Sequence, residues 1–200
     1  MELFHGFSDI LTLIGRGEMK HGKRHRAEVS RSLPQWERKF LAYKALKRKL
    51  KLTNPNSNGR NRVRSGNLPT QDMGFKQSLN REIDKVNTFY LDKEEDYIIM
   101  LRELESRAEN LNGNDEEMLE LRRELLDFYS EMVMLLHYSV INFTGLMKIV
   151  KKHNKRAGGA VQSSYMPRVL QQPFFSTELL YNLIRGCEAT LERLSPPNDP

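Results

Sequence analysis

Two long apolar stripes, separated by the turn Asn112-Gly113-Asn114, constrain this chain more than any other feature. In each stripe apolar side chains recur in steps of three, four or seven residues. Such steps place the side chains along one face of an α-helix, in the pattern of a coiled coil. The Asn-Gly-Asn turn between the stripes is a strong helix stop. The pattern therefore predicts helices over 73–111 and 116–154 that pack antiparallel.

Two shorter helices are predicted nearer the ends of the chain. Pro34 suits the first turn of a helix over 33–52, and a last amphipathic helix is predicted over 174–194. The apolar face of the earlier helix carries Trp36, Phe40, Tyr43 and Leu50. Residues 53–72 are rich in Asn, Gly, Ser and Pro and are predicted to form a mobile loop, and 195–200 a disordered tail. We find no strand pattern and predict an all-α protein.

Charge is divided sharply along the chain, whose formal net charge is +6. Residues 1–70 hold 16 Lys and Arg against 5 Asp and Glu, a net +11; residues 71–147 hold 8 against 17, a net −9; residues 148–200 hold 8 against 4, a net +4. A long helical hairpin in the middle would let the two basic ends meet. The joint patch would attract a polyanion, such as nucleic acid, an anionic membrane or a phosphorylated small molecule. The alternative is an ordinary solvated surface.

Several classes of protein are excluded by what the sequence lacks. No uninterrupted run of about 18 apolar residues is present, which argues against a membrane channel or transporter. Cys187 is the single cysteine, so the chain forms no internal disulfide and suits a reducing compartment. We find no phosphate-binding Gly-rich loop, no nucleophile with its base, and no acidic cluster spaced for a metal. The sequence therefore predicts a protein without catalytic activity, cofactor or metal.

The segment from Lys148 to Arg156 carries five Lys and Arg and no acidic residue. At about 100° per residue, and with Leu146 at 0°, its lysines fall between about 140° and 240°, opposite the apolar face. These lysines are Lys148, Lys151, Lys152 and Lys155. Like charges this close repel, and the helix C-terminus offsets only part of the repulsion. The arc is either a solvated face or one side of an anion site.

Lys47 is a second candidate, because it falls on the apolar face of the helix predicted over 33–52. A lysine there must extend its head to solvent or meet an anion. Tyr43 precedes it by one turn, so its hydroxyl and the ammonium can converge. A site of Lys and Tyr donors without a carboxylate suits compact, highly charged phosphate groups.

Five segments of this chain resemble the SPX domain family, and most closely the short plant proteins that consist of little else. The segments are MKHGK at 19–23, SLPQWERKFLAYKALKRKLK at 32–51, DKEEDYIIMLREL at 92–104, FYSEMVMLLHYSVINFTGLMKIVKKHNKRAGG at 128–159 and VLQQPFFSTELLYNLIRGCE at 169–188. They occur in the family's order. The likeness implies an SPX-like domain over 19–194, preceded by an extension of unknown role over 1–18.

The resemblance implies a fold and a ligand. The fold is an N-terminal helical hairpin packed on a long three-helix bundle, and the ligand is an inositol polyphosphate, with a preference for inositol pyrophosphates. The family's phosphate-binding residues map onto Tyr43, Lys47, Lys148, Lys151, Lys152 and Lys155. Lys20 and Lys23 add possible phosphate contacts near the start of the first helix. The chain departs from the family pattern at His21, His25 and Asn154.

The resemblance also implies a role and a partner. SPX proteins report phosphate status, and the liganded plant proteins bind and inhibit phosphate-starvation-response transcription factors of the MYB coiled-coil type. We therefore expect a sensor in the nucleus or cytoplasm, with no direct contact to nucleic acid or membrane. Two alternatives stay open: a basic helical protein that binds nucleic acid directly, and a coiled-coil adaptor that needs no ligand.

Overall fold

The computed structural model describes residues 34–52, 68–111, 115–156 and 171–195. Its elements are η1 (Pro34–Lys39), α3 (Tyr43–Leu52), α4 (Leu68–Glu109), α5 (Asp115–Arg156), η3 (Pro173–Phe175) and α7 (Glu178–Arg193). All of these elements are helical, which confirms the all-α prediction for the part of the chain that the structure describes. Residues 1–33 lie outside these ranges. They include Lys20 and Lys23, the possible phosphate contacts, and His21 and His25, two of the departures from the family pattern.

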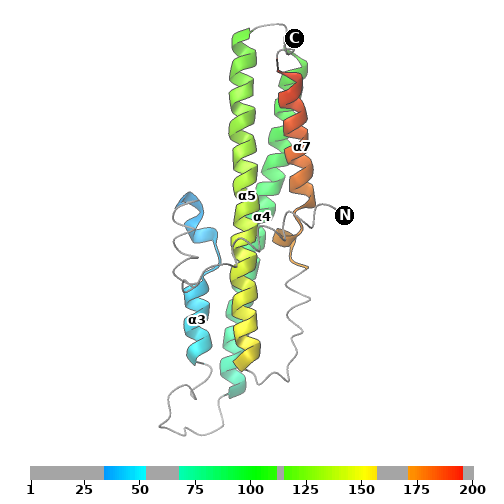
Figure 1. Ribbon diagram of the computed structural model, residues 1–200. Helices are drawn as coiled ribbons and strands as arrows, with labels where there is room; N and C mark the ends of the chain where they lie inside the picture. Colours follow the sequence, from blue (N-terminus) through cyan, green and yellow to red (C-terminus); the bar gives the residue numbers. More distant parts are fainter. Residues whose placement is uncertain (1–33, 53–67, 112–114, 157–170, 196–200) are drawn as a thin grey trace.

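The predicted antiparallel hairpin is present as α4 and α5, each 42 residues long. At 1.5 Å per residue each helix extends about 60 Å, and Figure 1 shows the two side by side along their whole length. Helix α4 begins at Leu68, so the last residues of the predicted loop over 53–72 are helical instead. Apolar side chains from both helices pack against each other along the pair. This shared core stabilises both helices over their full length.

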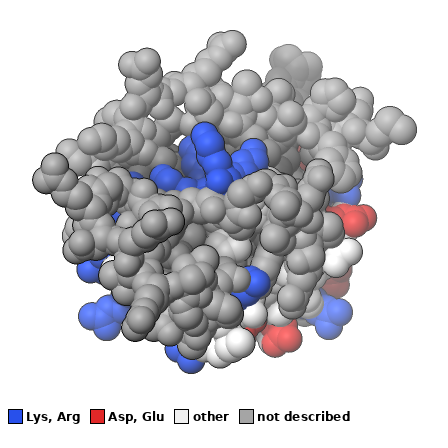
Figure 2. All heavy atoms as spheres, turned by 90° about the horizontal axis from the view of Figure 1, so that it is seen from below, with Lys and Arg blue, Asp and Glu red and all other residues white. Residues whose placement is uncertain are grey.

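A different helix completes the bundle at each end of this pair (Figure 1). Helix α7 packs on α4 and α5 near the turn that joins them, where Gly186 lets it approach Leu101 closely. Helix α3 packs on α4 and α5 at the opposite end. Seen from that opposite end, Lys and Arg side chains gather at the centre of the molecule (Figure 2). The last helix predicted over 174–194 is divided into η3 and α7, because the chain is not helical at Ser176 and Thr177.

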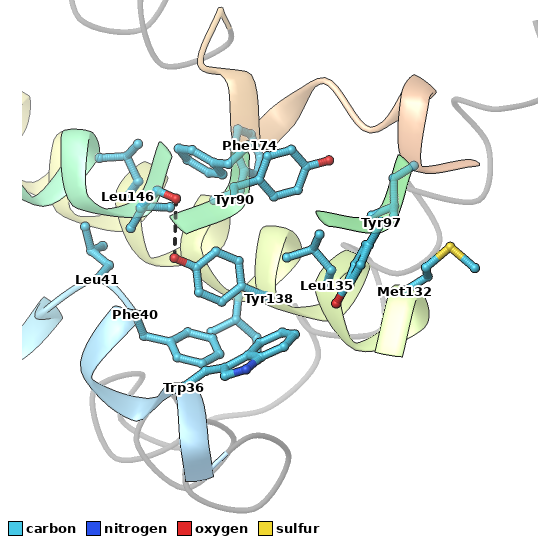
Figure 3. Close-up of a cluster of buried hydrophobic side chains, with 14 of the residues drawn as sticks. Trp36, Phe40, Leu41, Tyr90, Tyr97, Met132, Leu135, Tyr138, Leu146 and Phe174 are labelled. Atoms are coloured by element: carbon cyan, nitrogen blue, oxygen red, sulfur yellow. Dashed lines mark hydrogen bonds between the residues drawn. The ribbon is translucent and has the colours of Figure 1, made fainter. Parts of the chain in front are cut away.

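The core between these two ends is rich in aromatic side chains (Figure 3). Trp36 meets the rings of Phe89 and Tyr138 edge-on, with centroids 5.1 and 6.1 Å away, and Phe40 lies 4.7 Å from Tyr138. Contacts of this kind add about 0.5–1.5 kcal/mol each to the effect of burial alone. The short helix η1 is therefore fixed on the α4–α5 pair by its aromatic side chains.

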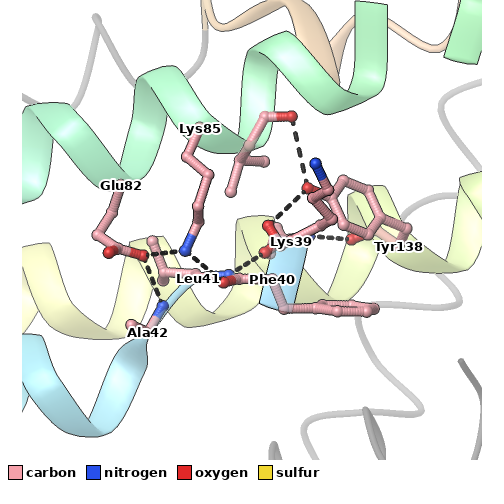
Figure 4. Close-up of polar contacts among 9 residues, drawn as sticks. Lys39, Phe40, Leu41, Ala42, Glu82, Lys85 and Tyr138 are labelled. Atoms are coloured by element: carbon pink, nitrogen blue, oxygen red, sulfur yellow. Dashed lines mark hydrogen bonds and ion pairs between the residues drawn. The ribbon is translucent and has the colours of Figure 1, made fainter. Parts of the chain in front are cut away.

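The single helix predicted over 33–52 is wrong in one respect: the chain leaves the helix at Phe40 and resumes it at Tyr43. Side chains from α4 and α5 form hydrogen bonds with the backbone groups at this break (Figure 4). The N–H of Leu41 donates to Oδ1 of Asn142 at 2.7 Å, and the N–H of Ala42 donates to Oε2 of Glu82 at 2.8 Å.

Carbonyl groups before the break are satisfied in the same way. Lys85 Nζ donates to the carbonyl of Phe40 at 2.8 Å, and the Tyr138 hydroxyl donates to that of Lys39 at 3.0 Å. These partners replace the bonds that a continuous helix would make, so the break costs no unsatisfied backbone group. The break allows η1 and α3 to pack on the bundle in different directions.

Helix α5 is long and apolar enough to cross a membrane if length and composition alone are considered. Its mean hydropathy reaches 1.4 in one 18-residue window, although polar residues interrupt every long apolar run within it. Most of that window, 61%, is buried inside the protein, as expected for a helix that forms the centre of a bundle.

Candidate functional site

The break before α3 fixes where this helix lies along α5. Leu41 is tied to Asn142, and the two helices then run in the same direction side by side (Figure 1). Helix α3 begins two residues after this tie and packs on α5. A count of about 1.5 Å per residue from the tie puts Lys47 near the height of Lys148, and Lys51 near that of Lys152.

The orientation of α3 about its own axis decides which of its lysines faces α5. Lys49 Nζ contacts Ser78 Oγ, so that flank of α3 faces α4. Tyr43, Leu46 and Leu50 point into the core. Lys47 lies on the other side of this buried face, about 160° from Lys49 on a helical count. Lys47 therefore lies on the flank of α3 next to α5, where it is half-buried.

The four lysines of α5 differ in exposure and in their place around the helix. Tyr138 and Asn142 mark the flank of α5 that faces η1 and α3. On a helical count Lys152 comes closest to that flank, and Lys148, Lys155 and Lys151 follow in one continuous arc. Lys152 and Lys148 are half-buried, whereas Lys151 and Lys155 are exposed. Helix α3 therefore lies nearest to Lys152.

The basic end of α5 packs on α4 beside these lysines. The ring of His153 on α5 stacks on that of Phe75 on α4, with centroids 4.9 Å apart and planes 9° from parallel. Tyr43 is 5% exposed, and burial raises the pKa of its hydroxyl. Tyr43 therefore keeps its proton at neutral pH and remains a hydrogen-bond donor.

The structure also shows basic residues that the sequence analysis did not select. A hollow of about 470 Å³ lies on α3, and the described residues that line it are Lys44, Lys47, Arg48 and Lys51. Figure 2 shows Lys and Arg side chains together at this end of the molecule. The spacing of three, four and seven residues along α3 is the signal that could have found them, since it places all four on one side of the helix.

The chemistry available here is that of hydrogen-bond donors and positive charge. Lysine, arginine and neutral tyrosine present N–H and O–H groups, and the side chains of α3 include no carboxylate. In the described residues, no three His, Cys, Asp or Glu side chains come close enough to hold a metal ion. The arrangement suits the binding of an anion with several phosphate groups.

Comparison with known proteins identifies the family of this chain. A family model described as the SPX domain matches residues 106–169, which include the basic end of α5. SPX domain-containing protein 2 of Arabidopsis thaliana is 41% identical over 193 residues, covering 90% of this chain and 67% of the relative. The chain belongs to the SPX domain family. SPX domain-containing protein 1 of Arabidopsis thaliana is 40% identical, covering 90% of this chain and 73% of the relative.

A solved SPX structure supports the fold. The SPX domain of Chaetomium thermophilum glycerophosphodiester phosphodiesterase 1, in complex with inositol hexakisphosphate, matches with a TM-score of 0.70 and 24% identity. The match covers 88% of this chain and 99% of that one. The SPX-like helical architecture implied by the sequence is therefore confirmed. The plant SPX relatives named above bear no enzymatic name.

Proposed function

We propose that this protein binds inositol polyphosphates where α3 meets the end of α5, and that it acts as a sensor of phosphate status without catalytic activity. The direct phosphate contacts in this proposal are Lys47, Lys148 and Lys152, with the hydroxyl of Tyr43 at their buried edge and Lys151, Lys155, Lys20 and Lys23 as further sources of positive charge. We call the surface between Lys47 and the pair Lys148 and Lys152 the α3–α5 seam.

One observation carries the proposal: the hydrogen bond from Leu41 to Asn142 ties the start of α3 to α5, the helix that carries Lys148 and Lys152. Lysines on two neighbouring helices can donate to one anion from two sides. A multiply charged phosphate ester suits them better than a single carboxylate, because each lysine can donate to a separate oxygen. The inositol hexakisphosphate complex of the related fungal SPX domain is consistent with this ligand class.

The sensor role follows from where the ligand sits. An anion at the α3–α5 seam would contact both α3 and the bundle, so it would favour one position of α3 over others. A changed α3 position presents a changed surface to a partner. We propose that the preferred ligand is an inositol pyrophosphate and that the partner is a phosphate-starvation-response transcription factor of the MYB coiled-coil type. The liganded protein would bind and inhibit this factor in the nucleus or cytoplasm.

Isothermal titration with inositol hexakisphosphate and with an inositol pyrophosphate tests the proposal. We expect saturable binding to the wild type and a loss of at least tenfold in affinity for Lys152→Ala and for the double variant Tyr43→Phe/Lys47→Ala. Circular dichroism should show unchanged helicity in these variants. Arg123→Ala, which removes an exposed cation from the same helix far from the seam, is the matched control and should bind as the wild type does.

The same titrations separate the two other functions. A nucleic-acid-binding protein would bind duplex DNA tightly, with an affinity that falls steeply as salt increases, and would give no heat with the inositol phosphates. An adaptor would bind its partner equally with and without ligand. Either result would overturn the sensor proposal, and retained affinity in both seam variants would show that the site lies elsewhere.

A further inference from the structure

The hollow on α3 continues the seam onto the outside of this helix. With Tyr43 at 0°, Lys47 falls at about 40°, and three more cations follow at about 80°, 100° and 140°. These are Lys51, Lys44 and Arg48, all of them exposed. We call these three residues the outer arc. Lys47, which belongs to the seam, lies next to them on the helix, so the two surfaces adjoin.

Nothing in the described part of the structure neutralises the outer arc. No hydrogen bond or ion pair joins its side chains to another described residue, and α3 has no acidic residue in its first turn. The carboxylate nearest the start of α3, that of Glu82, is engaged by the Ala42 N–H and by Lys85 Nζ.

The arc is unfavourable for α3 in the absence of an anion. Cations three and four residues apart on a helix repel each other. Lys51 gains some stabilisation from the C-terminal end of the helix dipole. Lys44, in the first turn, faces the positive end of that dipole and is destabilised by it.

The hollow beside these cations is open, and its volume is about 470 Å³. The four described side chains that line it only donate hydrogen bonds. The guanidinium of Arg48 can engage two oxygens of one phosphate group, and each lysine acts as a point charge.

We propose that the outer arc is a second row of phosphate contacts for the ligand that occupies the seam, and that it makes affinity depend on how many phosphate groups the ligand carries. This inference rests on the proposed function and assigns Lys44, Arg48 and Lys51 to it. The half-buried seam holds one edge of a compact organic polyphosphate, and the exposed arc attracts the phosphates on its other edge. A ligand with few phosphates reaches the seam alone.

The double variant Arg48→Ala/Lys51→Ala tests the proposal by titration with inorganic phosphate, tripolyphosphate and inositol hexakisphosphate. We expect a loss of about tenfold in affinity for the hexakisphosphate and less than about threefold for inorganic phosphate, with the wild-type salt dependence reduced. The control, Arg102→Ala/Arg123→Ala, removes two exposed cations from the far part of the bundle and should lose less than about threefold for every ligand.

Three outcomes count against the inference in different ways. Unchanged binding by the arc variant, together with loss in Lys47→Ala/Lys152→Ala, would overturn the outer arc and leave the proposed function standing. Equal losses of affinity in the arc variant and its control would show that only net charge matters, and would overturn the proposal that the outer arc is a binding site. No binding of hexakisphosphate or pyrophosphate ligands by the wild type would overturn the proposed function itself.

Discussion

The backbone N–H of Leu41 donates to Oδ1 of Asn142 at 2.7 Å, across 101 positions of the sequence. Asn142 is 1% exposed, and its Nδ2 donates to the Tyr138 carbonyl at 2.8 Å, which fixes the amide orientation. One buried side chain of α5 therefore holds the start of α3.

Replacing Asn142 should weaken both the fold and the site. In Asn142→Ala the N–H of Leu41 loses its acceptor in a buried place, which costs about 1–3 kcal/mol of unfolding free energy. Affinity for inositol hexakisphosphate should fall as well, because α3 is no longer held in register. Urea denaturation and titration measure the two effects, and Asn80→Ala, at an exposed asparagine of α4, is the control. Full affinity in a destabilised Asn142→Ala variant would show that binding does not depend on the position of α3 along α5, and would contradict this prediction.

Glu82 caps α3 from another helix. Its Oε2 accepts the N–H of Ala42 immediately before α3 and also pairs with Lys85 Nζ at 2.6 Å. A carboxylate at a helix N-terminus is favoured by the helix dipole, and α3 supplies none of its own in its first turn. Glu82→Ala should lower the unfolding free energy by about 1–2 kcal/mol, and Glu82→Gln, which keeps an acceptor, by less than half of that. Equal losses in the two variants would exclude the hydrogen bond as the source of stability.

The long hairpin could be predicted because its signal is local. Apolar steps of three, four and seven residues determine which face of each helix is buried, and Asn112-Gly113-Asn114 marks where the chain turns. The break at Phe40 to Ala42 could not be predicted in this way. It depends on side chains of Glu82 and Asn142, which come from helices 40 and 101 residues further along.

The candidate site was predicted in part for the same reason. Helical arithmetic on α5 alone finds a basic arc but gives no reason to divide it, because it does not show where α3 lies. Once the contact of Lys49 with Ser78 is known, one flank of α3 is assigned to α4 and the other to α5. The outer arc could have been predicted from the sequence by applying the same helical count to α3.

A buried acidic residue interrupts the apolar face of α4 and should make stability depend on pH. Glu94 is 7% exposed and its Oε1 has no hydrogen-bond partner. Burial raises its pKa, and the hydrogen bond from Tyr90 lowers it by a smaller amount. Because the folded-state pKa lies above the unfolded one, its contribution to stability is fully present below the unfolded value, near 4.5, and is lost as pH rises through the folded value.

Glu94→Gln isolates this effect. The variant should gain stability relative to the wild type between pH 4 and pH 7, by on the order of 1 kcal/mol at the upper end, since the charged form is no longer forced into the core. Urea denaturation at a series of pH values measures the difference. Glu95→Gln, at the exposed neighbour, should show no such trend. A difference that shrinks as pH rises would mean that Glu94 is stabilised as a carboxylate.

The division of the α5 lysines gives the sharpest test of the site. Lys148 and Lys152 are half-buried, and on a helical count Lys152 lies nearest to the flank that faces α3, whereas Lys151 and Lys155 are exposed. Loss of a partly desolvated charged hydrogen bond costs about 1.5–3 kcal/mol, and loss of an exposed ion pair about 0.2–1 kcal/mol. Alanine at Lys148 or Lys152 should therefore reduce hexakisphosphate affinity about tenfold or more, and alanine at Lys151 or Lys155 less than about fivefold.

The four variants control one another, since each removes one lysine from the same two turns of α5 and changes net charge equally. Titration at a single salt concentration is enough to rank them. Four equal losses would indicate that the ligand responds to total charge on α5 and makes no use of α3. The opposite ranking, with Lys151 and Lys155 dominant, would place the ligand on the side of α5 away from Lys47, and the α3–α5 seam could then no longer be its site.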